Sequence, residues 1–138
     1  MKSIRVLIVD DLPQVRQGLA SVLNLAARQT RPMIEVTGEA QNGMEAIQQA
    51  RALNPDVILM DLELPILDGY EATRQIKAEW PGMRVIILSI HDGEEEHRRA
   101  REAGADGFVV KGAQYRDLVN AILGMDGPTN AFEKGDQA

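Results

Sequence analysis

The chain has 138 residues, of which 44% are hydrophobic and 26% charged, the balance of one ordinary globular domain. Its 21 acidic and 15 basic side chains give a net charge of −6, which offers no overall attraction for phosphate backbones, so we expect no direct nucleic-acid binding by this chain. The absence of cysteine excludes disulfides and thiolate metal sites, and without a signal-peptide pattern or an apolar run of roughly 18 residues we expect a cytoplasmic protein that does not contact membranes.

Short apolar runs rich in β-branched residues predict strands, and segments with helical spacing of apolar residues separate them. In chain order the predicted elements are a strand at Ile4–Val9, a helix at Val15–Ala26, a strand at Ile34–Val36, a helix at Met44–Leu53, a strand at Val57–Met60, a helix from Asp68 to Trp80, a strand at Val85–Leu88, a helix at Glu94–Ala103, a strand at Phe108–Val110 and a helix at Leu118–Ile122. Strict alternation predicts an α/β fold: a flavodoxin-like, doubly wound, five-stranded parallel sheet of order 2-1-3-4-5 with five helices.

Local signals mark where several helices begin and end. Pro13 suits a first turn, Asn42-Gly43 precedes the second helix, and Asp68 with Glu71 three residues later resembles a capping box. Gly124 is a typical end signal for the last helix. We therefore interpret Asp68 as a helix cap rather than as a ligand for a metal ion.

The predicted helix at Glu94–Ala103 differs from the others, because only Ala100 and Ala103 are apolar. Opposite charges four residues apart, Glu94 with Arg98 and Glu95 with Arg99, are expected to add a few tenths of a kcal/mol each. Such a helix is either loosely held, and able to shift when its surroundings change, or simply a solvated face.

Polar side chains follow four of the predicted strands: Asp10-Asp11, Asp61, Ser89 and Lys111. Each alone could be a helix cap, but the carboxyl ends of parallel strands meet at one edge of the sheet. Three carboxylates in one crevice repel each other, and a hard divalent cation such as Mg²⁺ relieves that repulsion. A lysine and a hydroxyl add groups that can bind phosphoryl oxygens, so the set predicts a phosphoryl-transfer site with a carboxylate nucleophile.

Residues after about Gly124 lose periodicity and are rich in Gly, Pro, Asn and Asp. We expect one domain over residues 1–125, followed by a tail or linker over 126–138.

The chain resembles the receiver domain of two-component response regulators from about Ile4 to Met125. The residues that carry the resemblance are Asp10-Asp11, the stretch MDLELPILDG, Ser89, and Lys111 after a Phe-Val-Val strand. Pro65 and Gly69 match the loop and helix start of the family and have structural roles.

The resemblance implies a role for each matching residue. Asp10 and Asp11 look like the acidic pair that holds Mg²⁺, Asp61 like the phosphoacceptor and a third metal ligand, and the backbone carbonyl of Glu63 like a further ligand.

Three more positions match residues that respond to phosphorylation in the family. Ser89 occupies the switch-hydroxyl position, Lys111 the salt-bridging position and Phe108 the switch-aromatic position, although a phenylalanine there is also an ordinary core residue.

Some positions depart from the family pattern. Gly112 follows Lys111 where proline is common, which puts the usual cis peptide in doubt, and Ile90 follows Ser89 where a small residue is common. Glu63 and His91 occupy variable positions beside the site, where variation is associated with the lifetime of the phosphoryl group. We interpret His91 as a loop residue without a partner rather than as a phosphohistidine or metal ligand.

The resemblance implies a phosphorylation-activated switch that takes a phosphoryl group from a sensor histidine kinase or phosphotransfer protein and shifts the face formed by the fourth helix, fifth strand and last helix. It implies no enzyme beyond catalysis of the chain's own phosphorylation and dephosphorylation. Homodimerisation is an expectation from the family alone.

Three alternatives stay open. An Mg²⁺-dependent aspartyl-phosphate phosphatase would need a second Asp where Glu63 stands, and a flavodoxin-like flavin carrier would need a phosphate-binding loop where Asp10-Asp11 stand. A receiver that binds partners without being phosphorylated is the third.

The output is a separate question. The run from His91 to Gly112 resembles the subfamily fused to a helix-turn-helix DNA-binding domain. We expect the receiver part of a transcription regulator, with a stand-alone receiver that acts through protein contacts as the alternative.

Overall fold

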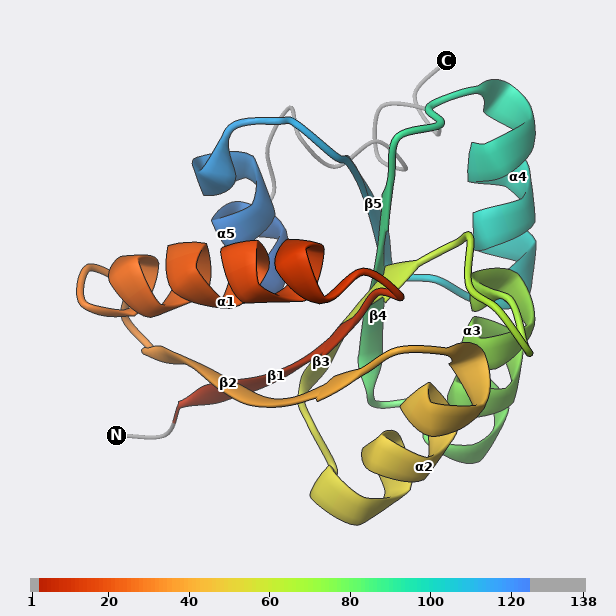
Figure 1. Cartoon of the computed structure of the whole chain (residues 1–138), viewed down its shortest axis with the longest axis horizontal. Coiled ribbons are helices and arrows are strands. Elements are labelled where there is room, and N and C mark those ends of the chain that lie inside the picture. The colour runs from red at the N-terminus through yellow and green to blue at the C-terminus, as the bar shows by residue number, and fades with distance from the viewer. Residues whose placement is uncertain (1–2, 125–138) are drawn as a thin grey trace.

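A five-stranded parallel sheet forms the centre of the molecule (Figure 1). The computed structural model describes residues 3–124. The strands are β1 (Ile4–Val9), β2 (Ile34–Ala40), β3 (Val57–Asp61), β4 (Arg84–Ser89) and β5 (Gly107–Val110). Their order is β2-β1-β3-β4-β5, and every pairing is parallel. The predicted fold class and strand order are confirmed.

Helices cover both faces of this sheet in the described part of the chain. They are α1 (Pro13–Ala27), α2 (Gly43–Leu53), α3 (Gly69–Glu79), α4 (Glu94–Ala103) and α5 (Tyr115–Leu123). Figure 1 shows α1 and α5 on one face and α2, α3 and α4 on the other. Each strand-to-strand connection passes over a face, as right-handed crossovers require.

Alternation along the strands divides the core into two layers. Leu7 and Val9 of β1 pack beneath α2 and α3, whereas Val6 and Ile8 pack beneath α1 and α5. All of β3 is buried, so its apolar run reads as continuous rather than alternating. A carboxylate at the end of that strand therefore enters a poorly solvated environment.

Side-chain caps begin two helices as predicted. Asn42 accepts a hydrogen bond from the Glu45 N–H at 2.7 Å, and Asp68 accepts one from the Glu71 N–H at 2.9 Å. The capping box at α3 is only half formed, because the Glu71 carboxylate binds Arg74 instead of returning to Asp68.

Two predictions are corrected. Strand β2 continues to Ala40, past the predicted end at Val36, because an edge strand pairs on one side only and tolerates the polar sequence from 37 to 39. On α4, Arg98 binds Glu95 at 2.6 Å and Glu102 at 2.9 Å rather than Glu94.

The second predicted pair on α4 is also absent from the described contacts. Arg99 lies over the ring of Tyr70 on α3, 4.0 Å from its centroid, instead of binding Glu95. Long side chains choose among several neighbours, and helical spacing alone does not decide which.

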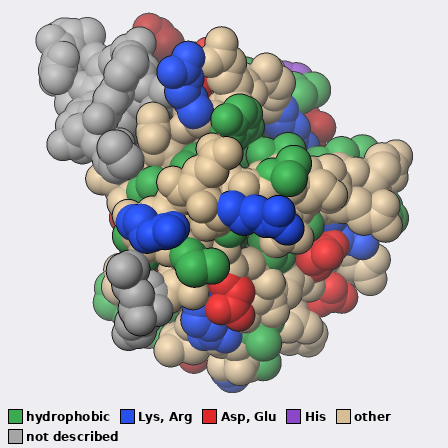
Figure 2. Space-filling model, turned by 90° about the vertical axis from the view of Figure 1, so that its left-hand side faces the viewer, with side chains coloured by type: hydrophobic (Ala, Val, Ile, Leu, Met, Phe, Trp, Pro, Cys, Tyr) green, Lys and Arg blue, Asp and Glu red, His purple; other side chains and the backbone are tan. Residues whose placement is uncertain are grey.

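On the side of the molecule that Figure 2 shows, hydrophobic side chains lie interspersed with basic and acidic ones. Scattered surface apolar groups of this kind are ordinary for a folded domain. Among the described helices, none is both long and apolar enough to span a membrane. The predicted tail at 126–138 lies outside the described residues, so the boundary at 125 stays a prediction.

Candidate functional site

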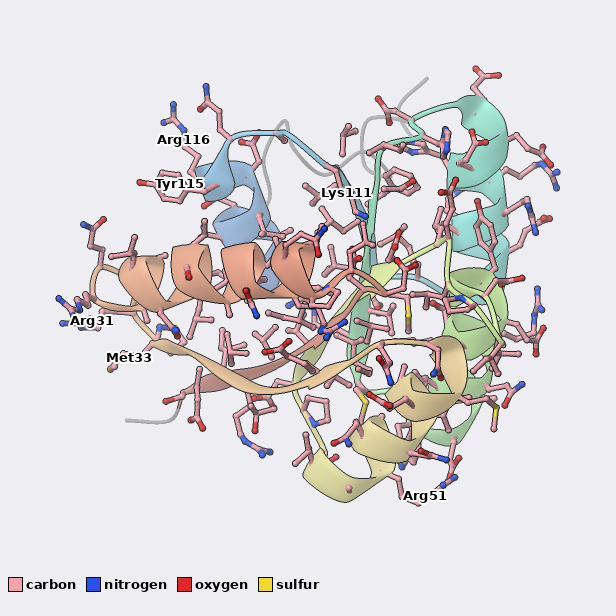
Figure 3. All side chains as sticks on the ribbon, in the orientation of Figure 1. Arg31, Met33, Arg51, Lys111, Tyr115 and Arg116 are labelled. Atoms are coloured by element: carbon pink, nitrogen blue, oxygen red, sulfur yellow. The ribbon has the colours of Figure 1, made fainter. Side chains whose placement is uncertain are left out.

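Four strand ends deliver polar side chains to one edge of the sheet. Asp10 follows β1, Asp61 ends β3, Ser89 ends β4 and Lys111 follows β5. In Figure 3, Lys111 projects from the end of β5 toward the ends of the neighbouring strands. This edge lies where β1 and β3, adjacent in space, lead to helices on opposite faces, the usual place for a ligand in such sheets.

Three carboxylates gather at this edge. One oxygen from each of Asp10, Asp11 and Asp61 lies within 4.8 Å of the others. Asp10 is 1% exposed and Asp61 6%, while Asp11 is exposed to solvent. The structure thus brings together the acidic residues that the sequence singled out.

Lys111 lies between the two buried carboxylates. Its Nζ is 2.9 Å from Asp10 Oδ2 and 3.3 Å from Asp61 Oδ1. Burial works to lower the pKa of Lys111, but its hydrogen bond to Asp10 and the charge of Asp61 outweigh that effect and raise the pKa above the ordinary value. Lys111 therefore stays a cation at the centre of the site.

Burial shifts the pKa of Asp61, the candidate phosphoacceptor, in the opposite direction from its effect on the pKa of Lys111. Desolvation raises the pKa of Asp61, the charge and hydrogen bond of Lys111 lower it, and the charge of Asp10 raises it, with a net increase. The Glu63 N–H also donates to Asp61 Oδ1 at 3.4 Å. The Glu63 carbonyl as a metal ligand stays a prediction.

The backbone around Asp10 is held by contacts that the sequence did not reveal. Asp10 Oδ1 accepts from the Leu12 N–H at 3.0 Å, and the Asp10 carbonyl accepts from Arg16 at 2.7 Å. Arg16 also pairs with Glu39 near the end of β2 at 2.8 Å. The sequence alone does not indicate this role for Arg16, because its partner Glu39 lies 23 residues away on another strand.

Ser89 is 2% exposed, and its Oγ accepts a hydrogen bond from the His91 N–H at 3.0 Å. The interpretation of His91 as lacking a partner is wrong, because His91 Nε2 lies 2.7 Å from Glu63 Oε1. This contact joins the loops after β3 and β4. The sequence does not indicate this contact, because Glu63 and His91 lie in separate loops.

Phe108 is 1% exposed and stacks on His97 of α4, with ring centroids 4.0 Å apart and planes 20° from parallel. His97 in turn lies 2.6 Å from Asp92 in the loop before α4. The aromatic ring at the predicted switch position is therefore already inside the molecule.

The peptide that follows Lys111 is trans, since the only cis bond among the described residues joins Arg31 to Pro32. Gly112 adopts a φ of +92°, which glycine tolerates without strain.

The donor set fits a hard divalent cation. All clustered ligand atoms are carboxylate oxygens, the preference of Mg²⁺. Lys111 balances one of the three negative charges, so the cluster still favours further positive charge.

Comparison with known proteins gives one consistent result. A family model described as response regulator receiver domain matches residues 6–123. The response regulator protein VraR of Staphylococcus aureus is 40% identical over 131 residues, which cover 95% of this chain and 60% of that protein. The chain thus spans about 60% of the length of the curated relatives it matches.

Solved structures agree. The signal receiver domain of a NarL response regulator from Mycobacterium tuberculosis is 31% identical, with a TM-score of 0.82 over 90% of this chain and 96% of that one. A LuxR-family two-component response regulator from Aurantimonas is 32% identical, with a TM-score of 0.79 over 99% of this chain and 98% of that one.

Proposed function

Because the chain belongs to the response regulator receiver domain family, we propose that it is a phosphorylation-activated switch of a two-component system, with Asp61 as the phosphoacceptor. The phosphodonor in this proposal is a phosphohistidine on a sensor histidine kinase or phosphotransfer protein. The observation that carries the proposal is the position of Lys111, within 3.3 Å of two buried carboxylates from other strands. A purely structural site would have little reason to bury two like charges.

Asp10, Asp11, Asp61 and the Glu63 carbonyl would hold Mg²⁺, whose charge, when bound, offsets that of the phosphoryl oxygens. The other contributions come from the chain itself. Lys111 carries a fixed positive charge beside Asp61, and the surrounding residues exclude most water from Asp61, which is 6% exposed.

In the transfer step an oxygen of the Asp61 carboxylate attacks the phosphorus atom. A P–O bond forms, the P–N bond of the phosphohistidine breaks, and its electron pair stays on the imidazole nitrogen. Because Asp61 is an anion before the step, no base has to remove a proton from it. Positioning and charge neutralisation are the main tasks of the site.

The acyl phosphate adds about −1.5 to −2 charges at the edge of the sheet, by analogy with other phosphorylated residues. Ser89 can turn its hydroxyl from the His91 N–H to a phosphoryl oxygen as a donor. That movement would pull on the loop before α4, and through Asp92 and His97 on the Phe108 ring. We propose that α4, β5 and α5 transmit the signal in this way.

The proposal is tested by labelling with a small phosphodonor, acetyl phosphate, in the presence of Mg²⁺. The variant Asp61→Asn should take no label and keep its fold. Asp68→Asn is the matched control, because asparagine caps a helix as well as aspartate and Asp68 holds no acceptor role. Hydroxylamine-sensitive label on Asp61→Asn would place the acceptor elsewhere and overturn the proposal.

For the output, we propose the receiver part of a transcription regulator, since a LuxR-family regulator is among the similar structures. A stand-alone receiver that acts through protein contacts is the alternative. Sustained turnover of small phosphate esters would instead indicate an enzyme.

Homodimerisation on phosphorylation is part of the proposal and is measured by sedimentation with and without acetyl phosphate.

A further inference from the structure

A series of contacts joins Ser89, at the end of β4, to Phe108 in β5 by way of helix α4. The Ser89 Oγ accepts a hydrogen bond from the His91 N–H at 3.0 Å. In the next residue, Asp92, the Oδ1 atom lies 2.6 Å from Nε2 of His97 on α4. The imidazole of His97 stacks on the ring of Phe108, with ring centroids 4.0 Å apart. The hydroxyl at the end of β4 is therefore connected to the buried ring through the loop before α4.

The two ends of this series differ in how firmly they are held. Phe108 is 1% exposed and belongs to the core layer beneath α2 and α3. Helix α4 has only Ala100 and Ala103 as buried residues, so little apolar area holds it in place. A ring that is already inside the core needs no inward rotation to respond to a change at Ser89. The part of the series that can move is α4 with the loop before it.

The contact between Asp92 and His97 fastens that loop to α4. A carboxylate only accepts hydrogen bonds, so the Nε2–H of His97 is the donor. The side chain of His97 is 14% exposed and that of Asp92 is 56% exposed. Water therefore competes for the Asp92 end of the contact, and the contact can break at a modest cost in free energy.

Phosphorylation of Asp61 would disturb this loop at its first contact. The new phosphoryl oxygens are strong acceptors, and they attract the Ser89 hydroxyl away from the His91 N–H. That N–H then lacks its acceptor, and Asp92 is the next residue in the chain. The loop therefore changes shape where its contact with α4 begins.

We propose that the Asp92–His97 contact holds α4 in the unphosphorylated arrangement and breaks on phosphorylation, while Phe108 stays buried. This inference rests on the proposed function. A contact that is made only in the unphosphorylated state opposes phosphorylation by its own free energy, so its loss makes the acceptor easier to phosphorylate. A contact with a structural role alone would lower the stability of the fold without speeding phosphorylation.

The test measures the rate of labelling by subsaturating acetyl phosphate with Mg²⁺. Asp92→Ala removes the acceptor of the contact, and His97→Phe removes the donor but keeps an aromatic ring against Phe108. Asp92→Asn keeps an oxygen that accepts from the His97 Nε2–H. Arg98→Ala is the matched control, since Arg98 is the next residue on α4 and pairs with glutamates of the same helix.

We expect Asp92→Ala and His97→Phe each to speed labelling by about three- to tenfold, the range for loss of one hydrogen bond. The double variant should be no faster than either single variant, because both changes remove the same contact. Asp92→Asn and Arg98→Ala should label at the rate of the unaltered chain.

Equal or slower labelling of Asp92→Ala and His97→Phe overturns the inference, and so does an Arg98→Ala variant that labels as fast as they do. Failure of the unaltered chain to take label on Asp61 would count against the proposed function instead.

Discussion

Lys111 decides how much charge the site can bury. It meets Asp10 and Asp61, which are both almost inaccessible to water, and its own side chain is 23% exposed. Among the described residues, Lys111 is the only cation in an ion pair with Asp10 or Asp61. Without Lys111, these two desolvated carboxylates would face each other uncompensated. Removal of one partner from a buried pair costs more than the pair itself contributes, because the remaining charges stay desolvated.

Lys111→Met should therefore lower the free energy of unfolding by about 1–3 kcal/mol at pH 7 in EDTA. Urea denaturation measures this loss, and added Mg²⁺ should restore part of it. Arg74→Met is the control, because the Arg74–Glu71 pair is exposed on both sides and is worth about 0.5 kcal/mol or less. Equal losses in the two variants would show that Lys111 has no special place in the site.

Asp61 has a pH dependence whose sign follows from its raised pKa. The folded state binds a proton at Asp61 more readily than the unfolded state, whose pKa is near the ordinary 3.8. Stability from this group is fully present below that pH and is lost as the pH rises through the folded pKa. At pH 7 the ionised carboxylate thus costs the folded state free energy, mainly through desolvation.

Asp61→Asn should accordingly have a higher Tm than the unaltered chain at pH 7 in EDTA. The difference should shrink as the pH falls through the raised pKa of Asp61 in the folded state, and it should vanish below the ordinary value of 3.8. Thermal melts across this range check the prediction. A variant that is less stable than the wild type at pH 7, or a difference that does not depend on pH, would contradict it.

Loop β3–α3 depends on a glycine at the first residue of α3. A Cβ at Gly69 would clash with the main-chain oxygen of Asp61 and crowd the Leu62 Cα. Both atoms belong to the backbone that carries the acceptor, so neither can yield by a side-chain rotation. The end of β3 and the first residue of α3 are therefore packed backbone against backbone.

Gly69→Ala should destabilise the fold by about 1–3 kcal/mol, the range of overpacked cores, and slow labelling by acetyl phosphate. Gly82→Ala is the control, because a Cβ there meets nothing within 4 Å. Unfolding curves and labelling rates for the two variants give the comparison. Wild-type behaviour of Gly69→Ala would mean that the loop is less closely packed than described.

Helix α4 is the element with the least apolar material. Its buried residues are Ala100 and Ala103, and its acidic first turn and Arg98 pairs face solvent. Exposed pairs contribute little, because water screens the charges and the side chains lose freedom.

We expect amides of α4 to exchange with solvent faster than those of α3, and Arg98→Ala to leave the free energy of unfolding almost unchanged. Hydrogen exchange and urea denaturation measure these effects. Slow exchange throughout α4 would argue against a movable helix.

Among the helices and strands, the sequence predicts those features that depend on residues close together in the chain. Asn42 and Asp68 cap their helices because each partner lies three residues away. The Glu63–His91 contact and the stacking of His97 on Phe108 join separate elements, so no local pattern indicates them. The turn at Ile66, whose φ is +71°, goes against the preference of its residue, and it is imposed by neighbours that are themselves fixed by the fold.

At the scale of the whole molecule, the site was predictable because topology assembles it. Lys111 and Asp10 are 101 residues apart, yet parallel strands in the order β2-β1-β3-β4-β5 bring their ends to one edge. The alternation of strands and helices in the sequence predicts that order. The distances at the edge, and which carboxylate the lysine approaches more closely, depend on packing that the sequence pattern does not contain.

We propose a single acceptor carboxylate whose capture of phosphate requires a divalent cation. The most direct measurement is peptide mapping by mass spectrometry after incubation of the unaltered chain with acetyl phosphate, with Mg²⁺ in one sample and EDTA in the other. We expect one phosphoryl group on the peptide that contains Asp61, present with Mg²⁺ and missing with EDTA. A phosphoryl group on another residue, or equal labelling in the two samples, would contradict it.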